Sequence, residues 1–212
     1  MERLTHERRK ELTRSALIDA AAELFARKGL LAASLDEIAE AAGFSRGAFH
    51  FHFDSKDDLF LAVLERYHDR LLEAYVVLPL VRESFGVDPA ANASAWKAIH
   101  DEGGIDHVLL QLEFRTYALR NPAFRSRAAE LEAHAVAASA EFLAQRAEEH
   151  GLRWRIPLEQ VTELLHITSR GLVELGAVTG TSGEPVFTTF LSMLWDSSLE
   201  PDPDAMTPRR PS

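Results

Sequence analysis

The sequence predicts an all-α protein in which a small N-terminal three-helix domain precedes a larger helical domain. Apolar residues recur every three or four positions through most of the chain, as on the buried face of a helix. Two short segments near the N-terminus carry helix-capping residues and are joined by a glycine turn. We expect the first domain over residues 1–56, the second over residues 57–200, and a disordered proline-rich tail over residues 201–212.

Composition and charge exclude several kinds of site. The 212 residues include no cysteine, which excludes disulfides and thiolate metal sites. No run of 18 apolar residues occurs, and no apolar segment follows the charged start "MERLTHERRK", so we expect a cytoplasmic protein without a membrane span. Residues 57–212 carry the whole net charge of −10, whereas residues 1–56 carry nine basic and nine acidic groups. The first 14 residues carry five basic and three acidic groups, a local excess that permits contact with a polyanion but does not by itself indicate one.

Three helices are predicted in the N-terminal segment. The first spans about residues 7–28, and its buried face is formed by Leu17, Ala20, Ala21, Leu24 and Phe25. Ser34 and Glu37 form a capping box at the start of the second helix, and Gly43 suits its C-terminal end. Ser45 then caps a third helix. Two short helices joined by a tight glycine turn make a helix-turn-helix.

The third helix contains the run "FHFHF", which alternates as a half-buried strand would. In a helix, however, His50 and His52 lie about 200° apart and cannot share a metal ion. Phe49 and Phe53 lie one turn apart, so both can enter the core. We therefore expect a helix, no metal site and no cofactor.

The segment "ALIDAAAELFARKGLLAASLDEIAEAAGFSRGAFHFHFDSKDDLFLAVL" resembles the N-terminal DNA-binding domain of the tetracycline-repressor (TetR) family. The resemblance covers about residues 12–64 and is carried by Ala21, Phe25, Gly29, Ile38, Ala39, Gly43, Gly47, Phe49, Phe53 and Lys56. It implies a repressor that binds a palindromic operator in duplex DNA as a homodimer and is released by a small-molecule effector. His50 departs from the family, which usually has a phosphate-contacting tyrosine there, and this leaves the contact open.

The resemblance also implies which residues face DNA. The residues expected to face phosphates are Ser34, Ser45, His50, His52 and Lys56. Those expected to face the major groove are Arg46, Gly47, Ala48 and Phe51. Short hydroxyls suit phosphate, and arginine can reach guanine bidentately. Two interpretations of Phe51 stay open, a contact with a thymine methyl and burial against a neighbouring helix. The basic N-terminal arm is either a solvated tail or a minor-groove contact.

The remaining chain resembles the family only in layout. Helical periodicity predicts helices over about residues 105–119, from Pro122 to near Gly151, from Pro157 and from Pro185. In the family the last two long helices pair across a two-fold axis. The resemblance thus implies a dimer interface that includes Leu164, Thr168, Gly171, Leu172, Leu175, Phe187, Phe190, Leu191 and Leu194. Burial of these residues within one subunit is the alternative.

A small-molecule site is expected among the middle helices, as the resemblance implies. Ligand pockets are mostly apolar with a few orienting polar groups, and the candidates of these types are Trp96, His100, Gln111, Phe114, Tyr117, His134, His166 and Arg170. Taken singly, residues of these types more often occupy core or surface positions than ligand contacts. The alanine, phenylalanine and tryptophan content favours an apolar or aromatic ligand.

Two functions other than transcriptional regulation have less support in the sequence. Glu163 and His166 form one Glu-x-x-His step, but a di-iron bundle needs two. The sequence also has no Gly-x-Ser-x-Gly elbow, phosphate-binding glycine loop or His-Glu-x-x-His motif. We therefore expect no enzyme. The alternatives are a helical small-molecule-binding protein and a metal-dependent helical-bundle enzyme, both without DNA function.

Overall fold

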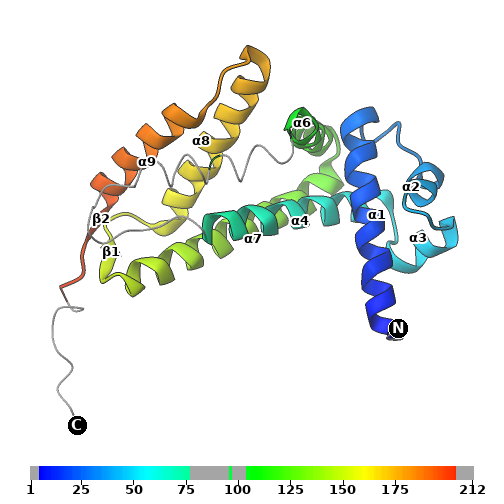
Figure 1. Ribbon diagram of the computed structural model, residues 1–212, viewed down its shortest axis with the longest axis horizontal. Helices are drawn as coiled ribbons and strands as arrows, with labels where there is room; N and C mark the ends of the chain where they lie inside the picture. The colour runs from blue at the N-terminus through cyan, green and yellow to red at the C-terminus, as the bar shows by residue number, and fades with distance from the viewer. Residues whose placement is uncertain (1–4, 77–95, 97–103, 204–212) are drawn as a thin grey trace, which may run out of the picture. The chain divides into compact units, whose positions relative to one another are not determined.

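The computed structural model describes residues 5–76, Trp96 and residues 104–203, and it confirms the all-α fold class (Figure 1). The helices are α1 (His6–Lys28), α2 (Leu35–Ala41), α3 (Arg46–His52), α4 (Lys56–Val76), α6 (Gly104–Arg120), α7 (Pro122–Glu149), α8 (Leu158–Thr179) and α9 (Glu184–Ser198). Two short strands, β1 (Leu152–Trp154) and β2 (Leu199–Pro201), pair antiparallel. The strand pair was not predicted from the sequence.

The chain divides into two packing units. The first comprises Met1–His68 and Gly103–Leu131, and the second comprises Asp69–Glu102 and Glu132–Ser212. The first unit thus includes α6 as well as the three short N-terminal helices. A domain boundary at residue 56 remains a prediction from the sequence pattern.

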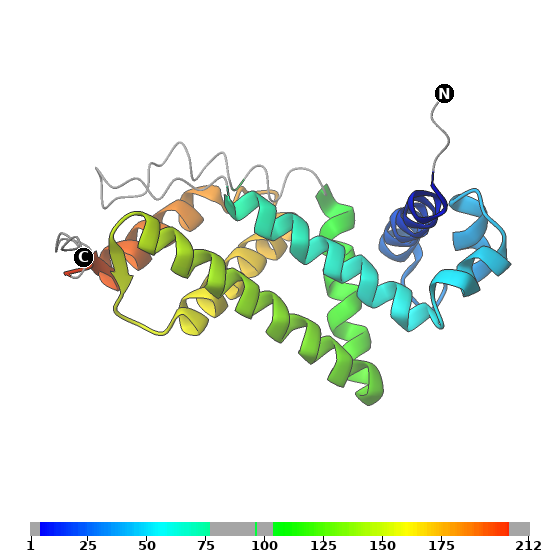
Figure 2. The ribbon, with the colours of Figure 1, turned by 90° about the horizontal axis from the view of Figure 1, so that it is seen from below.

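The core of the first unit is aromatic. Phe25, Phe49 and Phe60 are fully buried, and the rings of Phe25 and Phe60 meet edge to face with centroids 5.0 Å apart. Figure 2 shows the backbones of α1, α2 and α3 close together, and all three helices contribute residues to this core. Gly43 has φ +78°, which glycine adopts without strain, and the chain reverses there between α2 and α3. The predicted helix-turn-helix is therefore present.

Helix α6 is hydrogen-bonded to the residue that follows the end of α1 in the same unit. The carboxylate of Glu113 accepts a hydrogen bond of 2.7 Å from the backbone N–H of Leu30. Gly29 ends α1 with φ +79°, and a Cβ atom there would lie only 3.0 Å from the Glu113 carboxylate. A larger residue than glycine at position 29 would thus disturb both the turn and this contact.

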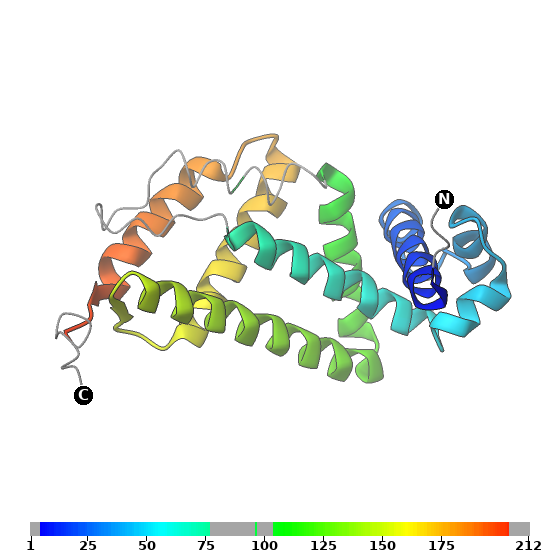
Figure 3. The same cartoon turned by 60° about the horizontal axis from the view of Figure 1, so that its bottom comes forward.

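The second unit is built on the hairpin of α8 and α9 (Figure 3). The two strands follow α7 and α9, and Arg153 and Arg155 donate to the Glu200 carboxylate at 2.6 and 2.8 Å. Pro201, which was expected to begin the tail, belongs to β2. Residues 204–212 lie outside the described residues.

No helix in the described part of the chain is long and apolar enough to cross a membrane.

Candidate nucleic-acid interface

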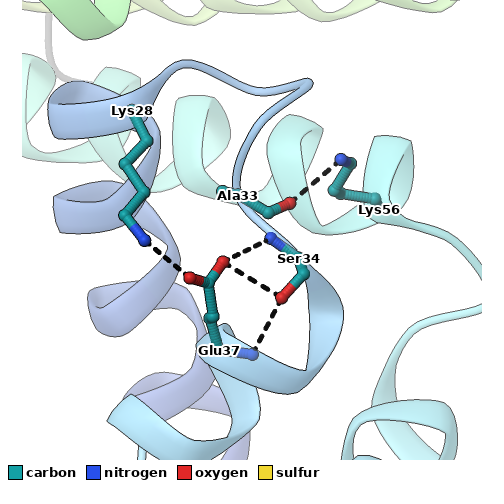
Figure 4. Close-up of polar contacts among 5 residues, drawn as sticks. All are labelled: Lys28, Ala33, Ser34, Glu37 and Lys56. Carbon is teal, nitrogen blue, oxygen red and sulfur yellow. Dashed lines mark hydrogen bonds and ion pairs between the residues drawn. The ribbon is translucent and has the colours of Figure 1, made fainter.

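The start of α2 is fixed by the predicted capping box (Figure 4). The Ser34 hydroxyl accepts from the Glu37 N–H at 3.2 Å, and the Glu37 carboxylate accepts from the Ser34 N–H at 3.0 Å. Lys28 donates to the same carboxylate at 2.6 Å. This hydrogen bond, together with those from Ser34, lowers the pKa of Glu37 to about 2. Ser34 is thereby held on the surface at the N-terminus of a helix.

Lys56 lies beside Ser34 in the same close-up. Its ammonium group donates to the carbonyl oxygens of Leu31 at 3.4 Å and Ala33 at 3.0 Å. Partial burial lowers the pKa of Lys56. Lys56 thus ties the loop before α2 to the start of α4. Its predicted phosphate contact would be a second role for the same ammonium group.

Helix α3 presents its N-terminal end to solvent. The Ser45 hydroxyl caps it by accepting from the Ala48 N–H at 3.3 Å. Arg46 and Gly47 are exposed, and Ala48 is half-buried. The Arg46 guanidinium lies 3.2 Å from a carboxylate oxygen of Asp36 on α2. Nothing in the sequence pattern singled out Asp36, because the pairing depends on how the turn sets α3 against α2.

The exposed aromatic ring of α3 is Phe51. It is 64% exposed, whereas Phe49 and Phe53 are buried in the core. Of the two interpretations of Phe51, burial against a neighbouring helix is therefore not found. The ammonium group of Lys10 lies 5.5 Å from the centroid of the Phe51 ring. His50, one residue before Phe51, is also exposed.

Two basic residues of α1 lie against α3. Arg14 stands 5.2 Å from the centroid of the Phe53 ring, in the same way as Lys10 stands over Phe51. Burial and the charges of Lys10 and Arg14 lower the pKa of His52. The basic arm is thus helical from His6 onward and adjoins α3, while residues 1–4 lie outside the described residues.

The predicted interface residues of α8 and α9 fall into three groups. Phe187, Leu191 and Leu194 are buried within a single chain, so for these three the alternative of a core position holds. Leu164, Gly171 and Leu175 are exposed, and Thr168, Leu172 and Phe190 are half-buried. Four further apolar residues are exposed that were not among the predicted interface residues, namely Ile167 and Val178 on α8 and Val186 and Met193 on α9. The helical period alone does not distinguish the two apolar faces of such a helix.

The predicted ligand residues lie in both packing units. Gln111, Phe114 and Tyr117 belong to the first unit, and Trp96, His134, His166 and Arg170 belong to the second. Phe114 and Trp96 are core residues, and the Tyr117 hydroxyl donates to Asp57 at 3.0 Å. His134 is exposed, and His100 lies outside the described residues.

Two polar contacts join α7 to α8 in the second unit. The Nε2 atom of His166 lies 3.3 Å from the Ser139 hydroxyl, and Arg170 pairs with Glu132 at 3.2 Å. Gln111 in the first unit is 5% exposed, and its amide nitrogen has no hydrogen-bond partner among the described residues. Within the described ranges, no three His, Asp or Glu side chains are grouped closely enough to hold a metal ion.

The chain is similar to known regulators in two ways. The family model for bacterial regulatory proteins of the tetR family matches residues 17–63. The HTH-type transcriptional activator FasR of Mycolicibacterium smegmatis is 48% identical over 59 residues, which are 28% of this chain and 27% of FasR. The HTH-type transcriptional regulator AcrR of Shigella flexneri is 45% identical over 65 residues, 31% of this chain and 30% of AcrR. The chain thus spans less than a third of the length of these relatives.

A solved structure is similar over nearly the whole chain. GusR of Salmonella enterica is 23% identical, with 92% of this chain and 100% of that chain covered and a TM-score of 0.67. At this identity the likeness shows a shared fold.

Proposed function

We propose that the chain is a transcriptional regulator of the TetR family of bacterial regulatory proteins and that it binds duplex DNA through α2 and α3. The observation that carries this proposal is the outer face of α3. Arg46, His50 and Phe51 are exposed on it, while Phe49 and Phe53 anchor the helix in the core. A helix held in this way can enter a major groove, where an arginine and an apolar ring can contact base edges.

The phosphate contacts would surround this face. Ser34 and Ser45 each begin a helix whose N-terminal amides favour an anion, and Lys10 and Arg14 extend the basic surface along α1. Phosphate contacts contribute affinity without sequence preference. Base preference would therefore depend on Arg46 and Phe51.

The regulator would act as a homodimer on a palindromic operator. The exposed apolar residues of α8 and α9 support this, because a large apolar surface on a water-exposed hairpin favours association. The helix-turn-helix domains of the two subunits, placed about 34–36 Å apart, would meet successive major grooves of the operator. We take the effect on transcription to be repression.

A small effector would bind among the helices that follow α3. Gln111 supports this, because a buried amide nitrogen without a partner is costly unless a bound group accepts its hydrogen bond. An apolar or aromatic molecule with one acceptor oxygen would satisfy it. The family match favours this regulator over a helical-bundle enzyme or a ligand-binding protein without DNA function.

Footprinting of the full-length protein on DNA flanking its own gene, or on duplexes selected from a random library, tests the proposal. We expect protection of a palindromic site at low salt. A protein that protects no duplex under these conditions would contradict the proposed function.

A thermal-shift screen of apolar and aromatic compounds then tests the effector. A stabilising compound should weaken operator binding, with a typical coupling of about 1–3 kcal/mol. Gln111→Leu should abolish the response to that compound. A compound that stabilises the protein and leaves operator affinity unchanged would show that its site is not regulatory.

A further inference from the structure

The ion pair between α2 and α3 joins a carboxylate to the residue best suited to read a base. The Nη1 atom of Arg46 lies 3.2 Å from the Oδ2 atom of Asp36. The two side chains are 60% and 65% exposed. Ion pairs this exposed add little to folding stability. The packing of α2 on α3 is instead provided by buried residues, among them Ile38, Ala39 and Phe49.

An exposed carboxylate on this surface also opposes DNA binding. A phosphate backbone repels Asp36 unless the neighbouring guanidinium balances its charge. Arg46 makes this contact with one nitrogen of a planar group that carries five N–H donors. Donors on the other nitrogens remain for an acceptor such as the O6 and N7 atoms of guanine.

We propose that Asp36 determines the sequence specificity of this interface by acting on Arg46, an inference that rests on the proposed function. Asp36 accepts a hydrogen bond from the guanidinium and so orients its remaining donors. Where Arg46 contacts guanine, the Arg46 guanidinium and the Asp36 carboxylate both keep their hydrogen-bond partners. On other sequences Arg46 swings to the nearest phosphate, which leaves the Asp36 carboxylate unpaired next to the DNA. Asp36 thus weakens binding to the wrong sequence more than binding to the operator.

Fluorescence anisotropy of the full-length protein with the selected operator and with a scrambled duplex, at one fixed salt concentration, tests the proposal. For Asp36→Asn we expect tighter binding to the scrambled duplex and no gain on the operator. The ratio of the two affinities should fall by roughly 5- to 10-fold, within the range that one bidentate base contact contributes. Thermal unfolding of each variant checks that the fold is intact, because Asp36 also lies in the first turn of α2.

Glu40→Gln is the matched control. Glu40 is an exposed acidic residue on the same helix, so the substitution makes the same change in charge. We expect it to tighten binding to both duplexes equally and to leave the affinity ratio unchanged. If Asp36→Asn also leaves the ratio unchanged, Asp36 acts by charge alone and the proposal is overturned.

The double variant shows whether Asp36 acts through Arg46. In an Arg46→Ala background, Asp36→Asn should produce no further fall in the affinity ratio. An equal fall in both backgrounds would overturn the proposal, because Asp36 would then act independently of Arg46. Failure of the proposed function is distinguishable, since the wild-type protein would then show no preference for any duplex.

Discussion

At the scale of single residues, His52 on α3 has a pKa that its surroundings lower. Burial, followed by the cations of Lys10 and Arg14, lowers its pKa and so disfavours the protonated form in the free protein. The rings of Phe51 and Phe53 flank it. A DNA phosphate nearby would favour the protonated form and raise this pKa.

We therefore predict that DNA binding takes up a proton and tightens as pH falls from 8 to 6. A pKa rise of one unit gives up to about a tenfold gain in affinity. His52→Gln should keep the affinity at pH 8 and lose this gain. Anisotropy titrations at fixed salt across the pH range measure both quantities.

His50→Phe serves as the comparison, because His50 stands on the exposed flank of the same helix. If His50 contacts a phosphate, this variant should weaken operator and scrambled duplex alike. A pH response that survives His52→Gln but disappears in His50→Phe would assign the proton to His50 instead.

At the scale of helices, α4 and α6 meet through a pair of tilted rings. The Tyr67 and His107 rings have centroids 4.1 Å apart. Burial lowers the pKa of His107 to about 4 from its ordinary 6.5. The unfolded chain therefore takes up a proton on His107 between pH 6.5 and 4, which the folded protein does not.

We predict that the His107 contribution lowers the free energy of unfolding by about 1–2 kcal/mol between pH 7 and pH 5. The stability that the neutral His107 contributes is thus fully present above pH 6.5 and is lost as pH falls. His107→Phe keeps an aromatic ring and should remove this part of the pH dependence, as measured by urea unfolding. The exposed His134 provides the control, and an equal effect of His134→Gln would contradict the assignment.

The junction of α1 with α6 depends on one carboxylate. Because the Leu30 N–H would be buried without a partner, Glu113→Ala should lower the free energy of unfolding by about 1–3 kcal/mol. Glu113→Gln retains an acceptor oxygen and should cost less. The exposed Glu130→Ala should change stability by less than about 0.5 kcal/mol in the same unfolding experiment. A Glu113→Ala variant as stable as Glu130→Ala would show that the junction does not need this bond.

The sequence predicted these helices well because their ends are encoded locally. Ser34 and Ser45 cap α2 and α3 as expected, and Gly29, Gly43 and Gly151 have positive φ at the expected ends. The strand pair was missed because each strand has three residues, and its partners Arg153 and Glu200 are 47 positions apart. Contacts at such separation leave no periodic pattern.

At the scale of the whole molecule, the proposed dimer makes a separate prediction. Ile167 and Val178 are 67% and 87% exposed on α8. Replacing either with Glu should weaken association by about 2 kcal/mol or more, because a charge would be buried in an apolar interface. Sedimentation should show dissociation to monomers at micromolar concentration. Leu119→Glu, an exposed position on α6, should leave the dimer intact.

Association that is unchanged in both α8 variants would exclude this face as the interface. The same experiment on Leu191 would be uninformative, since that residue is buried within one chain and its substitution would disturb folding. The sequence thus predicted the helices that could associate and some of their exposed residues, Leu164, Gly171 and Leu175, but it did not separate these from the buried ones. Apolar residues on both faces of α9 give a single broad stripe in the sequence.

The aromatic core of the first unit also affects how the protein is made. Phe60 lies against Phe114 and Phe124, with ring centroids 5.8 and 5.7 Å away, and the segments that form this unit are interrupted between residues 68 and 103. On the ribosome, the 63 residues from 69 to 131 take roughly 3–13 s to synthesise at typical rates. During that interval the nascent helix-turn-helix lacks its supporting aromatic partners. The growing chain therefore exposes apolar surface to chaperones and proteases until α7 has begun to emerge.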